Sequence, residues 1–98
     1  MIQSDWAAEE DKVLRAFFAQ GRLKTLPVKF RKRLLVLRVF ARLFEPGKRF
    51  EEKEVNVRIG RMFPDYCTIR RELVDIGFMA RDGGSYWRLQ EDDWLPLL

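Results

Sequence analysis

DYCTIRRELVDIGFMARDGGSYWR, residues 65–88, encodes a capped helix, a glycine stop and a β-hairpin in direct succession. The carboxylate of Asp65 can accept hydrogen bonds from the first free amides of a helix, and Gly77 is suited to end it. The apolar residues between them recur at helical spacing on one face. They are Ile69, Leu73 and Ile76. The stretch therefore predicts one well-delimited helix over residues 65–76.

Two short strands are predicted immediately after that helix, over residues 78–81 and 86–89. They are joined across Asp82-Gly83-Gly84-Ser85, where the glycines can supply the positive φ angles that a tight hairpin demands. A helix followed directly by such a hairpin is the order of the second half of a winged helix.

Three further helices are expected upstream. The first is capped by Ser4 or Asp5 and stops at Gly21, and the second starts after Pro27 and runs over about residues 28–44. A short extended piece at residues 49–50 precedes the third helix, over residues 51–62. Together with the helix over residues 65–76, this third helix makes a helix-turn-helix. The predicted fold class is mainly α with a small β-hairpin (α+β): a winged helix-turn-helix with an additional N-terminal helix.

The helix over residues 28–44 is expected to be central, because most of its surface is apolar. The residues that share its main apolar face are Phe30, Leu34, Leu37, Ala41 and Phe44. A narrow stripe passes through Arg31, Leu35, Arg38 and Arg42, and every polar residue in it is basic.

The 98 residues, 47% hydrophobic and 35% charged, are typical of one soluble globular domain. We expect it to comprise an N-terminal helix (1–21), a winged-helix core (22–89) and an apolar docking tail (90–98). No stretch has the about 20 apolar residues that span a bilayer, and the acidic N-terminus lacks the features of a secretory signal. Cys67 is the one cysteine, so a reducing cytoplasm is the expected compartment.

The net charge of +4 is concentrated in one segment. Residues 22–49 hold ten basic side chains and one acidic one, whereas acidic side chains outnumber basic ones elsewhere. Such a segment would attract phosphates or an acidic partner. The alternative is a solvated helix face in an arginine-rich protein, and both interpretations stay open.

Apolar residues near both ends of the chain raise the question of what covers them. The N-terminal helix carries an aromatic side that includes Trp6, Phe17 and Phe18, and the tail carries Trp94 and Leu95. We expect the helix to pack on its own domain or on a second copy, and the tail to dock on its aromatic side, in this chain or in a neighbour.

Several short motifs lie along residues 22–89. They are Leu26-Pro27, Lys29, Lys32-Arg33, Phe44-Glu45, Gly47, Phe50, Glu54-Val55-Asn56, Asp65, Ile69-Arg70-Arg71-Glu72-Leu73-Val74-Asp75, Gly77, Arg81 and Tyr86-Trp87-Arg88. These motifs resemble a bacterial winged-helix family of unknown function, found alone or at the C-terminus of transcriptional regulators. The chain departs from it at Glu51, where a hydroxyl cap is usual, and at Trp87. The resemblance implies a winged-helix fold and an association with regulators, but no settled activity.

We expect contacts to DNA from the helix over residues 65–76, from the hairpin and from the basic segment. The candidates on the helix and hairpin are Thr68, Arg70, Arg71, Arg81 and Arg88. Those on the basic segment are Lys29, Arg31, Lys32, Arg33, Lys48 and Arg49. An alternative for Arg70 and Arg71 is that acidic neighbours hold them, so that they fix the helix pair instead of reading DNA.

A second hypothesis is a protein-interaction or dimerisation module, which would form a homodimer or receive a regulator subunit through the aromatic helix and the tail. We expect no enzyme, because the chain has no histidine to activate Cys67 and no phosphate-binding glycine loop. No cofactor, metal or small-molecule substrate is expected. The acidic runs are more simply explained as charges at helix starts and as a solvated linker than as metal ligands.

Overall fold

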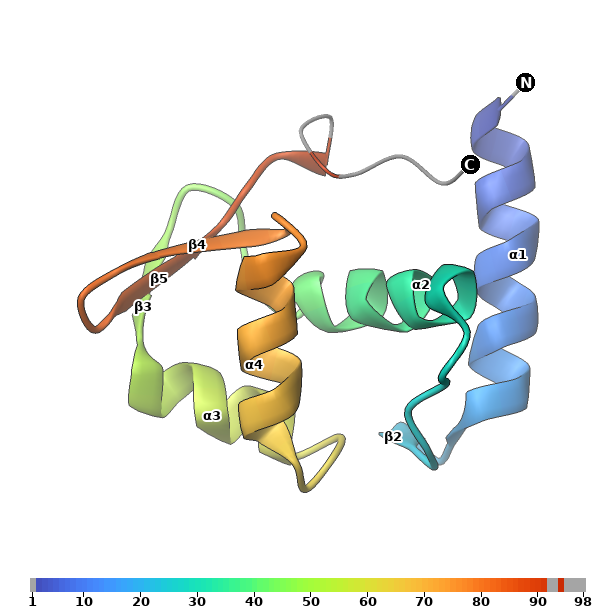
Figure 1. Ribbon diagram of the computed structural model, residues 1–98, viewed down its shortest axis with the longest axis horizontal. Helices are drawn as coiled ribbons and strands as arrows, with labels where there is room; N and C mark the ends of the chain where they lie inside the picture. Colours follow the sequence, from blue (N-terminus) through green and yellow to red (C-terminus); the bar gives the residue numbers. More distant parts are fainter. Residues whose placement is uncertain (1, 92–93, 95–98) are drawn as a thin grey trace.

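The structure is a computed structural model that describes the backbone of residues 2–91 and 94 and the side chains of residues 8–91 and 94. Its elements in chain order are α1 (Ile2–Phe17), β1 (Phe18–Ala19), β2 (Arg22–Leu23), α2 (Phe30–Ala41), β3 (Arg49–Glu51), α3 (Glu52–Gly60), α4 (Tyr66–Asp75), β4 (Met79–Asp82) and β5 (Ser85–Arg88) (Figure 1). The described residues thus form a mixed α+β fold with two small antiparallel sheets, which confirms the predicted class at this level.

The larger sheet has the strand order β3-β5-β4. Tyr86 of the central strand is paired with Phe50 on one side and with Arg81 on the other. The extended piece predicted at residues 49–50 is therefore confirmed, as an edge strand of this sheet. Figure 1 shows the sheet at one end of the molecule and α1 at the other, with α2 and α4 between them.

Helix α4 forms as the sequence predicts. The Asp65 carboxylate accepts hydrogen bonds from the Thr68 backbone N–H at 3.3 Å and from the Thr68 hydroxyl at 2.7 Å. Ile69 and Leu73 are fully buried, and Gly77 follows the helix with a φ of +89°. Both the predicted cap and the predicted stop are confirmed.

The hairpin is confirmed, but its strands lie one residue away from the predicted positions. Phe78 is fully buried in the core and precedes the first strand, and Asp82 is paired with Ser85, so the loop is Gly83-Gly84 alone. Of the two glycines, only Gly83 has a positive φ, of +62°. The expectation that both glycines need this conformation was wrong.

Helix α1 begins before the predicted caps and ends at Phe17, short of the predicted residue 20. The chain turns instead through a second hairpin, in which β1 and β2 flank Gln20 and Gly21. These two residues have φ values of +54° and +76°, as a two-residue hairpin turn requires. The segment between the first two predicted helices therefore contains strand β2.

Helix α2 is shorter at both ends than the predicted range. Lys29 precedes it without a side-chain cap, and the chain leaves the helix after Ala41. Phe30, predicted to lie in the interior, is the first residue of the helix and is 60% exposed. Among the described residues no helix is long and apolar enough to cross a membrane.

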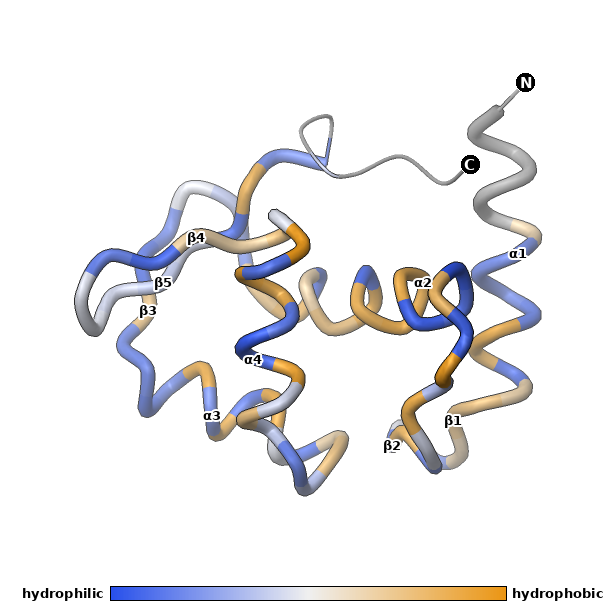
Figure 2. The backbone as a smooth tube through the Cα atoms, in the orientation of Figure 1, coloured by the Kyte–Doolittle hydropathy of each residue, from blue (hydrophilic) through white to orange (hydrophobic). Residues whose placement is uncertain are grey.

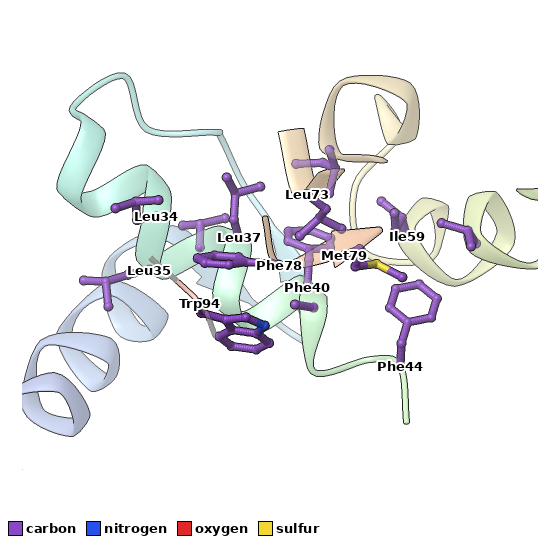
Figure 3. Packing of buried hydrophobic residues seen from close by; sticks show 14 of the residues in the cluster. Leu34, Leu35, Leu37, Phe40, Phe44, Ile59, Leu73, Phe78, Met79 and Trp94 are labelled. Atoms are coloured by element: carbon purple, nitrogen blue, oxygen red, sulfur yellow. The ribbon is translucent and has the colours of Figure 1, made fainter. Parts of the chain in front are cut away.

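The core is built around α2 and the elements that pack on it. Figure 2 shows apolar residues along much of this helix, and six of its residues are at most 3% exposed: Leu34, Leu35, Val36, Leu37, Phe40 and Ala41. Figure 3 shows side chains from α2, α3, α4 and the segment entering β4 meeting at one centre. The predicted central position of this helix is thereby confirmed.

Trp94 belongs to the same core. Its ring centroid lies 4.7 Å from that of Phe78, and its indole N–H donates to the Leu89 carbonyl at 3.0 Å (Figure 3). The tail was predicted to dock on the aromatic side of the first helix. The Trp94 ring is instead buried beside the start of β4. Leu95 lies outside the described residues.

Gly77 and Gly60 give a matched test of this backbone. We expect Gly77→Ala to destabilise the protein by about 1–2 kcal/mol, because an L side chain is strained at positive φ. Gly60 ends α3, and a Cβ there would meet Tyr66 at an ordinary 3.6 Å. Gly60→Ala should therefore be neutral or stabilising by up to about 1 kcal/mol in urea-induced unfolding. Equal effects of the two substitutions would contradict this account.

Candidate nucleic-acid interface

A hollow of about 180 Å³ separates α4 from the β4–β5 hairpin. We call it the helix–hairpin hollow, and it is lined by Arg70, Arg71, Val74, Asp75, Arg81 and Tyr86. Three of the ten arginines and lysines that the sequence singled out for DNA contact thus come together here. Candidates from α4 and from the hairpin meet at this hollow.

Arg70 forms the rear of the hollow and is held by α3. Its Nη1 donates to Asn56 Oδ1 at 2.5 Å and lies 3.9 Å from Glu52 Oε2, and its side chain is only 12% exposed. Its Nε is buried and has no hydrogen-bond partner. Residues of α3 therefore hold this arginine, as the alternative for Arg70 predicted, but they are Asn56 and Glu52, whereas Glu54 and Glu72 pair with Arg58 and Arg33.

Tyr86 also lines the hollow, and Glu52 of α3 lies behind it. The Tyr86 hydroxyl donates to Glu52 Oε1 at 2.7 Å. This hydrogen bond, and next the Arg70 charge, hold the pKa of Glu52 below its ordinary value, while burial and then Glu52 raise the pKa of Tyr86. Glu52 is consequently ionised at neutral pH and partly offsets the charge of Arg70.

Arg71 and Arg81 form the exposed rim of the hollow. Arg71 makes no ion pair with any described residue, and the pairing with Asp75 that its spacing allows is not formed. Arg81 Nη2 donates to the Gly83 carbonyl at 3.3 Å, and its guanidinium lies 5.4 Å from the Tyr86 ring. Both residues are exposed and form no ion pair with a described carboxylate, although the charge of Arg71 helps to lower the pKa of Asp65 and that of Arg81 helps to lower the pKa of Glu52.

The other candidates on α4 and on the sheet do not line the hollow. Thr68 is engaged in the cap with Asp65, whose pKa that hydroxyl lowers. Arg49 stacks on Trp87 at 4.0 Å, on the β3–β5 side of the sheet. Arg88 does not flank the hairpin tip, since its Nη1 donates to the Phe44 carbonyl at 3.2 Å and its Nη2 lies 3.4 Å from Glu91.

A shallower depression beside the hollow contains basic residues that the sequence reading missed. Lys53 and Arg61, both exposed, line it together with Asn56 and Tyr66. Because Asn56 also holds Arg70, the two concavities adjoin across that hydrogen bond. Lys53 and Arg61 lie eight residues apart in the sequence, so they form no charge run that would have marked them.

Much of the basic segment is neutralised within the chain. Arg31 Nε donates to Glu9 at 2.6 Å, and Arg33 Nε donates to Glu72 at 2.7 Å. Lys48 lies 3.6 Å from Glu45. Lys32 lies 6.0 Å from the centre of the Phe17 ring, and Lys29 is exposed before α2.

The basic stripe of α2 faces α1 and the C-terminal segment. Arg38 lies 3.3 Å from Glu10 and 3.7 Å from Glu91, and Arg42 pairs with the same two carboxylates. The ring of Trp94 covers the guanidinium of Arg38 at 5.1 Å. We call Glu10, Arg38, Arg42, Glu91 and Trp94 the arginine–tryptophan cluster. It joins three segments, and within it Arg38 is buried whereas Arg42 and Glu91 stay partly exposed.

The aromatic side of α1 packs on the chain's own core. Phe17 and Phe18 are half-buried, and the Phe18 ring lies 6.2 Å from that of Phe40 on α2. Trp6 has no described side chain. Of the two alternatives for this helix, the structure thus shows the contact within one chain.

Comparison with protein families shows where the chain belongs. Residues 22–88 match the family described as an uncharacterized protein conserved in bacteria (DUF2087). The chain is therefore a member of this bacterial family of unknown function. Neither the curated proteins nor the solved structures gave a match to the chain. The match starts at β2 and ends with β5, so it contains the helix–hairpin hollow but neither α1 nor Trp94.

The arginine–tryptophan cluster predicts a dependence of stability on pH. The Arg42 hydrogen bond holds the pKa of Glu91 below its ordinary value of 4.5. The stabilisation is therefore complete above that value and is lost as pH falls through the lowered pKa.

Glu91→Gln removes this titration. On going from about pH 6 to about pH 3, the melting temperature of the natural protein should fall further than that of Glu91→Gln, as measured by circular dichroism. Glu51→Gln is a suitable control, since Glu51 is exposed and makes no ion pair with the described residues. A Glu91→Gln curve parallel to that of the natural protein would rule out this role.

Proposed function

We propose that this protein binds nucleic acid, with duplex DNA as the first candidate, through a winged helix-turn-helix. In this proposal α3 and α4 are the helix pair, α4 is the recognition helix and the β4–β5 hairpin is the wing. The order α2-β3-α3-α4-β4-β5 and the pairing of β3 with β5 support it. So does the direct packing of α3 on α4 across residues 61–65.

The observation that carries the proposal is the helix–hairpin hollow with Arg71 and Arg81 on its rim. A phosphodiester oxygen can accept charge-assisted hydrogen bonds from guanidinium groups, which present several donors in a planar fork. Two exposed arginines from different elements can hold one phosphate from two sides. Arg70 adds positive charge behind them, where Asn56 fixes its position.

The hairpin is proposed to approach DNA by its flank and not by its tip. Asp82 is exposed beside the loop and would repel a phosphate, whereas Arg81 lies over the Tyr86 ring on one flank and Arg49 over Trp87 on the other. Contacts of this kind position a protein on the duplex without reading its sequence. Arg71, which faces out of α4, is the candidate for contact with a base edge.

The neutralised residues of the basic segment contribute less to DNA contact in this proposal than the sequence predicts. Arg31 and Arg33 already have carboxylate partners. Lys29, Lys32 and Lys48 are exposed and would add long-range attraction of phosphates. The main contacts are therefore assigned to α4 and the hairpin.

Salt-dependent binding measures the number of phosphate contacts. We expect the natural protein to bind a random-sequence duplex in fluorescence anisotropy, with an affinity that falls steeply as salt is added. Arg71→Ala and Arg81→Ala should each weaken binding and each reduce the slope of log affinity against log salt by about one.

Arg31→Ala is the matched control, because it removes the same side chain from the basic segment at a residue paired with Glu9. It should leave the slope nearly unchanged. Absence of duplex binding at low salt would refute the proposed function. Loss of binding in Arg31→Ala together with normal binding in Arg71→Ala and Arg81→Ala would assign the contacts to the basic segment.

A further inference from the structure

An apolar groove runs between α2 and α4, on a different side of α4 from its arginines. Its volume is about 210 Å³, and we call it the α2–α4 groove. It is lined by Phe30, Arg33, Leu34, Leu37, Glu72, Asp75 and Ile76. Leu34 and Leu37 are almost fully buried in the core beneath it, so the groove is an opening onto the main apolar face of α2.

That apolar face continues beyond the part which the chain itself covers. Phe30 begins the series that Leu34 and Leu37 continue, yet it is 60% exposed, and Val28 just before the helix is 91% exposed. Two large apolar side chains next to an apolar groove form a contiguous patch, whereas isolated exposed apolar residues are ordinary. The patch therefore contains both an exposed aromatic ring, that of Phe30, and an apolar groove.

We infer that the α2–α4 groove receives a second copy of this chain, in a two-fold symmetric dimer. A two-fold interface uses the same patch on both copies, so the patch must contain its own complement. Here the Phe30 ring of each copy would lie against Leu34, Leu37 and Ile76 of the other. An aromatic ring buried in such a groove is the usual main contributor to binding energy at an interface.

The charges around the patch fit the same arrangement. Lys29 precedes Phe30 and Asp75 borders the far side of the groove, and neither makes an ion pair with a described residue. Arg33 and Glu72, which also line the groove, neutralise each other. A two-fold operation would place Lys29 of one copy opposite Asp75 of the other twice, with no unpaired charge left in the groove.

This surface differs from the dimer surface that the sequence suggested. Phe17 and Phe18 are half-buried against the core of the same chain, and Trp94 is 5% exposed. The inference does not rest on the proposed function, since Arg71 and Arg81 lie outside the α2–α4 groove.

Light scattering after size-exclusion chromatography, at concentrations from the micromolar to the hundred-micromolar range, tests the inference. The natural protein should form a dimer, and Phe30→Glu should weaken the dimer by about tenfold or more. Val57→Glu is the matched control, because Val57 is an exposed apolar residue on α3, outside the groove, with 43% exposure. Circular dichroism of both variants checks that they are folded.

A charge exchange identifies the proposed pairing without touching the apolar contact. Lys29→Asp and Asp75→Lys should each weaken the dimer severalfold, whereas the protein carrying both substitutions should dimerise nearly as well as the natural one. A natural protein that stays monomeric over the whole range would overturn the inference. So would a dimer that Phe30→Glu does not weaken, or single charge variants whose effects simply add in the double variant.

Discussion

A buried guanidinium constrains how the two ends of the described chain pack. Arg38 lies in the most buried helix and is 7% exposed, and a charge in such a place is tolerated only with partners that compensate it. The partners come from outside α2: Glu10 from α1 and Glu91 from the segment after β5. Trp94 covers the remaining face of the guanidinium. Packing of α1 and of the C-terminal segment on α2 follows from this single requirement.

The same requirement redistributes the positive charge of the molecule. The basic segment draws Glu9, Glu10, Glu72 and Glu91 onto α2, where the charges neutralise one another. Exposed cations that form no ion pair with the described residues remain in that segment, at Arg22, Lys24, Lys29 and Lys32, and occur also at Arg71 on α4, at Lys53 on α3 and at Arg61 just after it. The arginines of α2 are thus paired with carboxylates, whereas Arg71 and Arg81 form no ion pair with a described residue. For this reason the proposal rests on α4 and the hairpin.

Short-range features could be predicted from the sequence. The Asp65 cap joins residues three apart, and the stop at Gly77 and the Gly83 turn are set by single residues with a positive φ. The ion pairs could not be predicted, since Arg31–Glu9, Arg33–Glu72 and Arg42–Glu91 join residues 22, 39 and 49 apart in the chain. Helical periodicity likewise placed Phe30 on an apolar face correctly. It could not indicate that the described residues leave the Phe30 side chain 60% exposed.

The sequence also could not show that α4 separates two surfaces of opposite character. Successive helical residues are rotated by about 100°, so a ten-residue helix can bury one side and still present two others. Ile69 and Leu73 face the core. Arg70 and Arg71 face the hairpin, and Glu72 faces α2.

Asp75 borders both concavities of α4, and its location sets a limit on how independently they can act. An unpaired carboxylate at that point reduces the attraction of the helix–hairpin hollow for phosphate, because like charges repel across a few ångströms. If Lys29 of a second copy pairs with Asp75, that repulsion is reduced. Dimerisation through the α2–α4 groove would then strengthen phosphate binding at the hollow without any change in the backbone, and phosphate binding would favour the dimer to the same extent.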